Sequence, residues 1–212
     1  MGKRQEAAKL TRTAIVEAAA KLQREKGLSN VSIDEIVAEA GVSKGSFYTY
    51  FKRKEDIAVE TSFDNFDGIK KRLPAASAGA AVRIGIFLKE SVRLIVETGV
   101  ETCKDWMKAA VSPVNGDCNG MRKLVYDREF ILEELRRGKE LEAGEGTGDR
   151  EGTGAGKSAD AVTAEELADI ITAEYYGNVA LWSMTDGAFP IEERTKQYAD
   201  GILPRMLEDL GG

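Results

Sequence analysis

Histidine is absent from the 212-residue chain, and its absence removes several kinds of catalytic and metal site. Serine–histidine and cysteine–histidine nucleophiles, the two-histidine iron site and most zinc sites all need an imidazole. The two cysteines, Cys103 and Cys118, are too few for a disulfide framework and fit a reducing compartment. The sequence therefore predicts no catalytic residue, no metal site and no cofactor, and we do not expect an enzyme.

Long uninterrupted apolar runs are also missing. The apolar stretch at residues 84–96 is broken by Lys89, Glu90 and Arg93, so it cannot span a bilayer. The chain does not open with a basic and then apolar leader. We therefore expect a cytoplasmic protein with no membrane partner.

Charge is distributed unevenly along the chain. Residues 1–54 hold eleven Lys and Arg against six Asp and Glu, a charge of +5. The remaining residues hold nineteen basic and thirty acidic side chains, a charge of −11, and the two parts give the net charge of −6. A small basic segment followed by a large acidic one indicates that the first segment alone meets a polyanion.

Apolar residues recur at helical spacing, and strand-like alternation is not sustained, so we expect an all-α fold. The first periodic segment begins near Ile15 and stops at Gly27. Ser32 and Glu35 then form a capping box that opens a second helix, which Gly41 ends. Ser43 can cap a third helix only two residues later. Two short helices joined by so tight a turn predict a helix-turn-helix.

The third helix, at residues 44–50, has two different faces. Phe47, Tyr50 and Phe51 share the packing side, whereas Gly45, Tyr48 and Thr49 point away from it, with Lys44 and Ser46 on the flanks. Such an outward face suits a recognition helix in a DNA major groove, because glycine permits close approach and hydroxyl and amine groups reach phosphates or base edges. The alternative is a solvated surface helix with one stray tyrosine.

Residues 41–57 resemble the recognition-helix signature of the TetR family of bacterial transcriptional repressors. Their sequence is Gly-Val-Ser-Lys-Gly-Ser-Phe-Tyr-Thr-Tyr-Phe-Lys-Arg-Lys-Glu-Asp-Ile. Together with the two preceding helices, the resemblance covers about the first 57 residues. It implies an all-helical protomer of three DNA-binding helices followed by about six for ligand binding and dimerisation. Arg53 departs from the pattern, since the family usually has a Ser or Asn cap there; the sequence then predicts no side-chain acceptor for the next helix. The predicted DNA-binding residues are Ser32, Ser43, Lys44, Gly45, Ser46, Tyr48, Thr49, Tyr50, Lys52, Arg53 and Lys54.

Residues 53–212 are predicted to form the ligand-binding and dimerisation domain, following a helix-turn-helix domain at residues 1–52. Within the second domain, residues 144–158 are a glycine-rich, flexible loop. The loop ends in Gly-Lys-Ser, but Glu151 stands where a phosphate-binding loop needs glycine, so we expect no nucleotide site. Thr163 and Glu166 form a second capping box, and Pro190 starts the last helix.

Aromatic and sulfur-containing residues of this second domain are candidates for a pocket that binds a small apolar or aromatic molecule, although each could equally be ordinary core. They are Phe63, Phe66, Phe87, Cys103, Trp106, Met107, Phe130, Tyr175 and Tyr176. The last two helices carry more apolar residues than one core needs, which favours a four-helix dimer interface. Its candidate residues are Tyr175, Val179, Trp182, Ile191, Tyr198 and Ile202.

These patterns together predict a homodimeric, ligand-responsive regulator that binds palindromic double-stranded operator DNA, most simply a repressor that its ligand releases. One alternative is a helical small-molecule-binding or protein-interaction module whose helix-turn-helix does not touch DNA. A second is a hydrolase or transferase built on the C-terminal helices, against which the missing histidine and the broken phosphate loop both argue.

Overall fold

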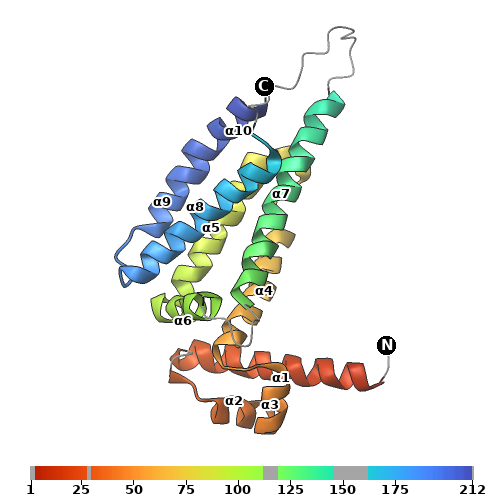
Figure 1. Cartoon of the computed structure of the whole chain (residues 1–212), viewed down its shortest axis with the longest axis vertical. Helices are drawn as coiled ribbons and strands as arrows, with labels where there is room; N and C mark the ends of the chain where they lie inside the picture. The colour runs from red at the N-terminus through yellow and green to blue at the C-terminus, as the bar shows by residue number, and fades with distance from the viewer. Residues whose placement is uncertain (1–2, 28–29, 112–118, 146–161, 212) are drawn as a thin grey trace. The chain divides into compact units, whose positions relative to one another are not determined.

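The computed structural model describes residues 3–27, 30–111, 119–145 and 162–211, and these form helices without a strand, which confirms the all-α prediction (Figure 1). Cys118 and residues 146–158 of the predicted loop lie outside the described residues, whereas Gly144 and Glu145 belong to a helix. The helices are α1 (Lys3–Lys26), α2 (Ile33–Ala40), α3 (Lys44–Tyr50), α4 (Glu55–Lys71), α5 (Ala80–Thr98), α6 (Val100–Val111), α7 (Asn119–Glu145), α8 (Ala164–Met184), α9 (Ile191–Gln197) and α10 (Leu203–Gly211), with a 3₁₀ turn at Ala76–Ala78.

The chain divides into two compact units. Unit 1 comprises residues 1–68, 95–123 and 183–187; unit 2 comprises residues 69–94, 124–182 and 188–212. Several helices, α4 among them, contribute residues to both units. The domain boundary that the sequence predicts between residues 52 and 53 stays a prediction.

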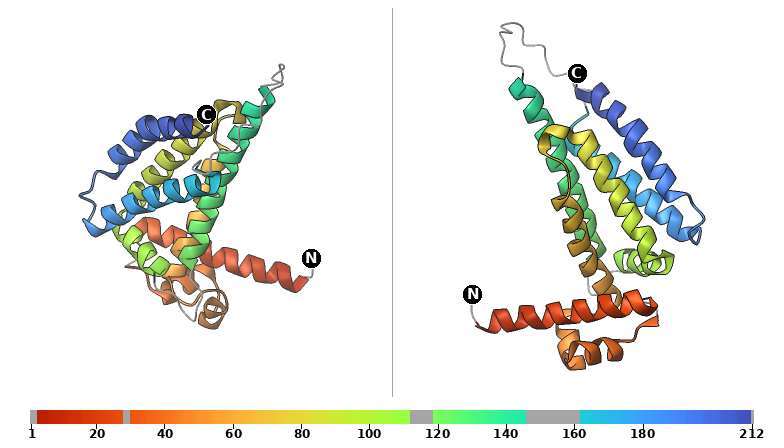
Figure 2. Two further views of the ribbon diagram at one scale, coloured as in Figure 1. Left: turned by 45° about the horizontal axis from the view of Figure 1, so that its top comes forward. Right: turned by 180° about the vertical axis from the view of Figure 1, so that it is seen from behind.

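Unit 1 is built around the apolar faces of its first three helices. Ile15, Ile36, Phe47 and Ile57 are fully buried in one cluster, and Phe51 closes it at the end of α3. Figures 1 and 2 show α1 crossing α2 and α3, which lie on one side of it. The i, i+3, i+4 stripes of the sequence are therefore the faces that these helices bury.

Unit 2 has α5 at its centre. Ile84, Phe87, Leu88 and Val92 of this helix have almost no exposed surface, while α7, α8 and α9 lie around it in the views of Figure 2. A side chain at Gly85 would place its Cβ 3.4 Å from Ala199, so glycine allows the close approach of α5 to the C-terminal segment. The buried residues of α5 lie between Ile84 and Val92, and this stretch supplies much of the apolar core of unit 2.

The last helix differs from its prediction in one turn. The spacing of apolar residues predicts a regular helix from Pro190 in which Tyr198 and Ile202 share one face. Instead, residues Tyr198–Ile202 form a π-helical turn between α9 and α10. The wider turn rotates Ile202 outward, where 55% of its surface is exposed, and brings Leu203 into the core.

A buried ion pair joins α5 to α7 in unit 2. The Arg83 guanidinium donates to both carboxylate oxygens of Glu134, from Nε at 2.7 Å and Nη2 at 2.9 Å, and Arg137 adds a third bond at 2.8 Å. Burial by itself raises the pKa of Glu134, but its hydrogen bonds and charge interactions with the two arginines outweigh that effect and hold the pKa below 4.5. The carboxylate is therefore charged in the folded protein at neutral pH.

We expect Glu134→Gln to lower the free energy of unfolding by about 3 kcal/mol near pH 7, because it leaves Arg83 buried without its counterion. Since the folded state holds the pKa of Glu134 below its unfolded value, its contribution is present above pH 4.5 and is lost as the pH falls through the lowered value. The difference between variant and wild type should therefore shrink in urea unfolding curves measured below pH 4.

Glu133→Gln is the matched control, since Glu133 is the exposed neighbour of Glu134 on α7. Its replacement should change stability by less than about 0.5 kcal/mol. Equal losses for the two variants would contradict the assigned role of the buried pair.

Candidate nucleic-acid interface

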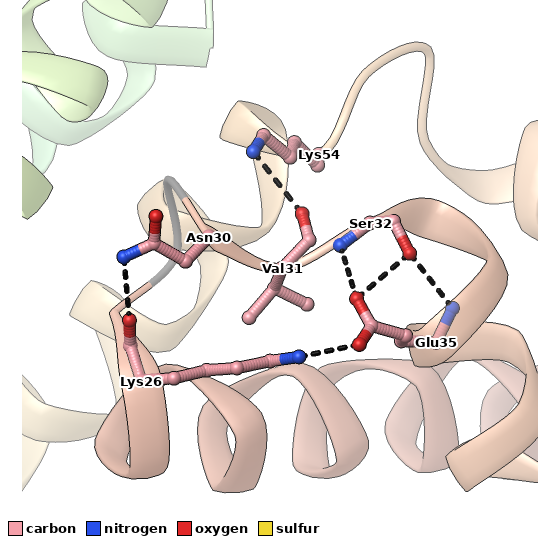
Figure 3. Close-up of polar contacts among 6 residues, drawn as sticks. All are labelled: Lys26, Asn30, Val31, Ser32, Glu35 and Lys54. Atoms are coloured by element: carbon pink, nitrogen blue, oxygen red, sulfur yellow. Dashed lines mark hydrogen bonds and ion pairs between the residues drawn. The ribbon is translucent and has the colours of Figure 1, made fainter.

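A capping box fixes the start of α2, as the sequence predicts. Ser32 accepts a hydrogen bond from the Glu35 amide at 3.2 Å, and the Glu35 carboxylate accepts one from the Ser32 amide at 2.8 Å (Figure 3). Lys26 of α1 donates to the same carboxylate. The bond from Lys26, followed by those from Ser32, lowers the pKa of Glu35 to about 2. Charged Glu35 therefore ties the N-terminus of α2 to the end of α1.

The turn between α2 and α3 depends on two residues. Gly41 has a left-handed backbone with a φ of 65°, and its amide donates to the carbonyls of Ala38 and Val37. Ser43 then caps α3, because its hydroxyl accepts the Ser46 amide at 3.0 Å. Glycine adopts the left-handed conformation without the penalty that a Cβ brings, and the serine satisfies an amide that α3 cannot. The helix-turn-helix of the sequence prediction is confirmed.

The face of α3 that points away from the cluster is polar and open. Phe47 has no exposed surface, whereas half of the Tyr48 side chain is exposed, and Gly45 and Thr49 are exposed beside it. The Tyr48 ring meets the Phe47 ring edge-on with centroids 5.4 Å apart, which holds the tyrosine against the helix. The Thr49 hydroxyl donates to the Gly45 carbonyl at 3.0 Å and keeps a lone pair for a further partner.

The basic residues of the predicted set each contact a group of the same unit. The Lys44 ammonium lies 2.9 Å from Asp34 of α2, and this hydrogen bond and charge raise the pKa of Lys44. The Lys54 ammonium donates to the Val31 carbonyl at 3.1 Å, next to the capping box of α2 (Figure 3). The structure thus places Lys54 beside the residues before α2, and Lys44 beside its first turn.

Asp56 supplies the acceptor that the sequence does not predict before α4. Its carboxylate accepts the backbone amides of Lys52 and Arg53, both at 3.2 Å, and also pairs with the Arg53 side chain at 3.1 Å. Both amides belong to residues that precede α4, so the expectation that the first amides of the helix itself lack a side-chain acceptor stays a prediction. Asp56 itself lies in the first turn of α4, three residues after Arg53, the position where the family usually has a cap.

Asp34 and Asp56 are two residues of this surface that sequence reasoning missed. Asp56 was within reach of a local search, since it lies only three and four positions from the amides it binds. Asp34 lies ten positions before Lys44, and the contact forms because the turn at Gly41 folds α3 back beside α2. Nothing in the local pattern marks that pair.

The nine candidate pocket residues divide between the two units. Unit 1 holds Phe63, Phe66, Cys103, Trp106 and Met107, and unit 2 holds Phe87, Phe130, Tyr175 and Tyr176. Two contacts join candidates of unit 2: the Phe87 and Phe130 rings are 4.5 Å apart, and those of Tyr175 and Tyr176 are 5.1 Å apart. In unit 1 the Cys103 sulfur lies 3.1 Å from the hydroxyl oxygen of Ser183, which is not a candidate. A single pocket lined by the whole set stays a prediction.

The candidate interface residues are mostly interior. Tyr175, Val179, Trp182, Ile191 and Tyr198 are buried within the single chain, and only Ile202 of the six is exposed. A different stripe of α8 faces outward: Ile170, Ala173, Gly177 and Leu181, at intervals of three or four residues. Periodicity reveals more than one apolar face on α8 but not which of them the core uses. The structure buries five of the six candidates within the single chain, and their role in a dimer interface stays a prediction.

In the part of the chain that the structure describes, no cluster of carboxylate or thiol ligands is arranged to hold a metal ion. None of the described helices is both long and apolar enough to cross a membrane.

Comparisons with known proteins agree with this geometry. Residues 15–61 match the model of the bacterial regulatory proteins of the tetR family. Transcriptional regulator AcuR of Cereibacter sphaeroides is 39% identical over 61 residues, which is 28% of each chain. The uncharacterized HTH-type transcriptional regulator YuxN of Bacillus subtilis is 49% identical over 45 residues, 21% of this chain and 16% of its own length. The chain therefore matches less than a third of the length of these two relatives.

The fold extends the likeness beyond the matched segment. Full-length TylP, a TetR regulator from Streptomyces fradiae, superimposes with a TM-score of 0.51 at 20% identity, covering 94% of this chain and 90% of that structure. At this identity the likeness concerns the fold alone.

Two glycines of this surface should respond oppositely to alanine. Gly41→Ala should lower the free energy of unfolding by about 1 kcal/mol, because its backbone is left-handed. Gly45→Ala should keep or raise stability, since a Cβ there would lie 3.7 Å from the Ser43 hydroxyl, an ordinary contact, and alanine favours helices. Thermal unfolding of both variants measures the difference, and a destabilised Gly45→Ala protein would contradict the assignment of an open α3 face.

Proposed function

Because residues 15–61 carry the N-terminal domain of the TetR family, we propose that the chain is a homodimeric, sequence-specific DNA-binding repressor that a small-molecule ligand releases from its operator. The observation that carries the proposal is the exposed polar face of α3, held outward by the buried Phe47 and Phe51. A chromosomal target would place the protein in the cytoplasm.

The proposed DNA contacts fall into two groups. Lys44, Gly45, Tyr48 and Thr49 on the open face of α3 reach base edges, with Ser46 and Tyr50 at its margin. Phosphates are bound from both ends of the motif, by the residues Ser32, Ser43, Lys52, Arg53 and Lys54. Contacts to phosphate give affinity and orientation, whereas contacts to base edges give sequence preference. A two-fold dimer would present two such faces to a palindromic operator, with half-site centres about 34–36 Å apart or a multiple of that distance.

The salt dependence of binding tests the phosphate group. We expect Lys52→Ala to weaken binding to all duplexes alike and to make the slope of log K against log salt shallower by about two, one contact from each protomer. Its control is Lys196→Ala, which removes the same charge from the exposed face of α9. Fluorescence anisotropy at several salt concentrations measures both, with a duplex selected from a random library by the protein itself.

Sequence preference tests the α3 face on the same duplexes. Thr49→Ala should change which duplex is preferred while keeping the salt slope of the wild type, since it removes no charge. Gly45→Ala should weaken binding to every duplex, because its added methyl group stands between α3 and the DNA. If the wild-type protein binds neither the selected nor random duplexes, the helix-turn-helix is not a DNA reader and the protein-interaction alternative holds.

Dimerisation is proposed through the outward stripe of α8 together with Ile202. Ile170 and Leu181 are about half exposed on the single chain, and Ala173 and Gly177 between them allow two helices to approach closely. A stable pair would bury more than about 1,200 Å² in total, which two helices from each protomer can supply.

We expect Leu181→Glu to convert the dimer to a monomer, because the stripe would bring two carboxylates together at the two-fold axis. Leu10→Glu is the control, since Leu10 is more exposed but lies on α1. Sedimentation at micromolar concentration should give twice the chain mass of 23.1 kDa for the wild type and Leu10→Glu, and that mass itself for Leu181→Glu. A wild-type monomer would contradict the proposal.

Release by a ligand is proposed to act through α4. This helix follows the recognition helix along the chain and extends from Glu55 to Lys71, with Phe63 and Phe66 among the candidate pocket residues. Release requires a ligand that binds the DNA-free protein more tightly than the DNA-bound protein, by a binding free energy of about 1–3 kcal/mol. Such a ligand weakens DNA binding about 5- to 150-fold, and DNA weakens ligand binding by the same factor.

A further inference from the structure

Three aromatic rings of unit 2 surround the side-chain ammonium of Lys70. The ammonium nitrogen lies 3.4 Å from the ring centroid of Tyr126, 4.7 Å from that of Phe130 and 5.8 Å from that of Phe87. Phe87 on α5 and Phe130 on α7 also pack on each other at 4.5 Å. The cage thus consists of one ring from α5 and two rings from α7, and the ammonium of Lys70 from α4 lies against them.

The surroundings of this cage favour positive charge. The negative faces of aromatic rings attract cations, and α4 ends one residue after Lys70, so its C-terminal carbonyls add a partial negative charge. The ring faces and the end of α4 therefore both favour a cation over an anion.

Lys70 is suited to leave the cage. Its side chain is only partly buried and ends a flexible four-carbon stem on the last turn of α4, so the ammonium can reach water. A primary ammonium is strongly hydrated and regains that hydration on leaving. A quaternary ammonium is the kind of cation that aromatic cages recognise, because it gives up little hydration on entering.

We propose that Phe87, Tyr126 and Phe130 form a binding site for an organic cation with an apolar body, a tertiary or quaternary ammonium, and that Lys70 occupies this site when the ligand is absent. The proposal deepens the proposed function, on which it rests for the ligand's role in release. Binding of the ligand frees the last turn of α4, the helix that begins after the DNA-binding residues.

Calorimetric titration of the full chain with benzyltrimethylammonium chloride tests the site without DNA. Lys70→Met keeps the stem and removes the competing charge, so this variant should bind the probe at least fivefold more tightly than the wild type. Lys71→Met removes the neighbouring exposed charge and should bind as the wild type does. If Lys70→Met does not fold, Lys70→Gln makes the same comparison.

The rings are tested in the same titration. Tyr126→Leu should weaken probe binding by about 2- to 30-fold, the range expected for one cation–ring contact, and Tyr126→Phe should restore it. Benzoate should not bind. Benzoate binding that Lys70→Met abolishes would show an anion site and overturn the proposal.

Failure of this proposal is separable from failure of the DNA-binding function. If wild type, Lys70→Met and Lys70→Gln all bind DNA but none binds benzyltrimethylammonium, the cage is a structural contact of Lys70 and the cation site is overturned. If the cation binds as described while no duplex binds, the cation site stands and the DNA-binding function fails.

Discussion

Burial of Phe47 is the constraint on which the polar face of α3 depends. A seven-residue helix has too few backbone hydrogen bonds to be stable alone, so α3 exists because its apolar side is packed. Phe47 inserts among Ile15, Ile36 and Ile57, and this insertion turns Tyr48 and Thr49 outward. The orientation of the proposed DNA-reading residues is therefore set by residues that touch no DNA.

Local signals account for most of what the sequence predicts correctly. The caps at Ser32, Ser43 and Thr163 each join residues three positions apart, and the left-handed Gly41 follows from the same short range. Helix existence and the buried faces of α1, α2 and α3 follow from apolar periodicity. These features need no knowledge of which helices become neighbours.

The features that the sequence does not predict depend on that knowledge. The two apolar faces of α8 look equivalent in the sequence, and packing buries Tyr175 and Val179 while leaving Ile170 and Leu181 outside. A π-helical turn lies between α9 and α10, so Tyr198 is buried and Ile202 is exposed although the sequence spacing places them on one face. The cage around Lys70 combines residues 17 to 60 positions from it, from Phe87 to Phe130, so no short window of sequence contains it. Aromatic residues could be flagged as pocket candidates, but the cation among them could not.

Lys44 and Lys70 illustrate how this chain holds its cations before any partner arrives. Asp34 binds Lys44 where both side chains are more than half exposed, and such surface pairs are worth about 0–1 kcal/mol, so an acceptor on a base edge can replace the aspartate at little cost. Three rings hold Lys70 in a less polar setting, where the exchange favours a cation less hydrated than lysine. In both places the resident contact sets a threshold that a partner must exceed. On α3 that threshold is low, because the pair with Asp34 is exposed to water. Around Lys70 the proposed exchange depends instead on the hydration of the incoming cation.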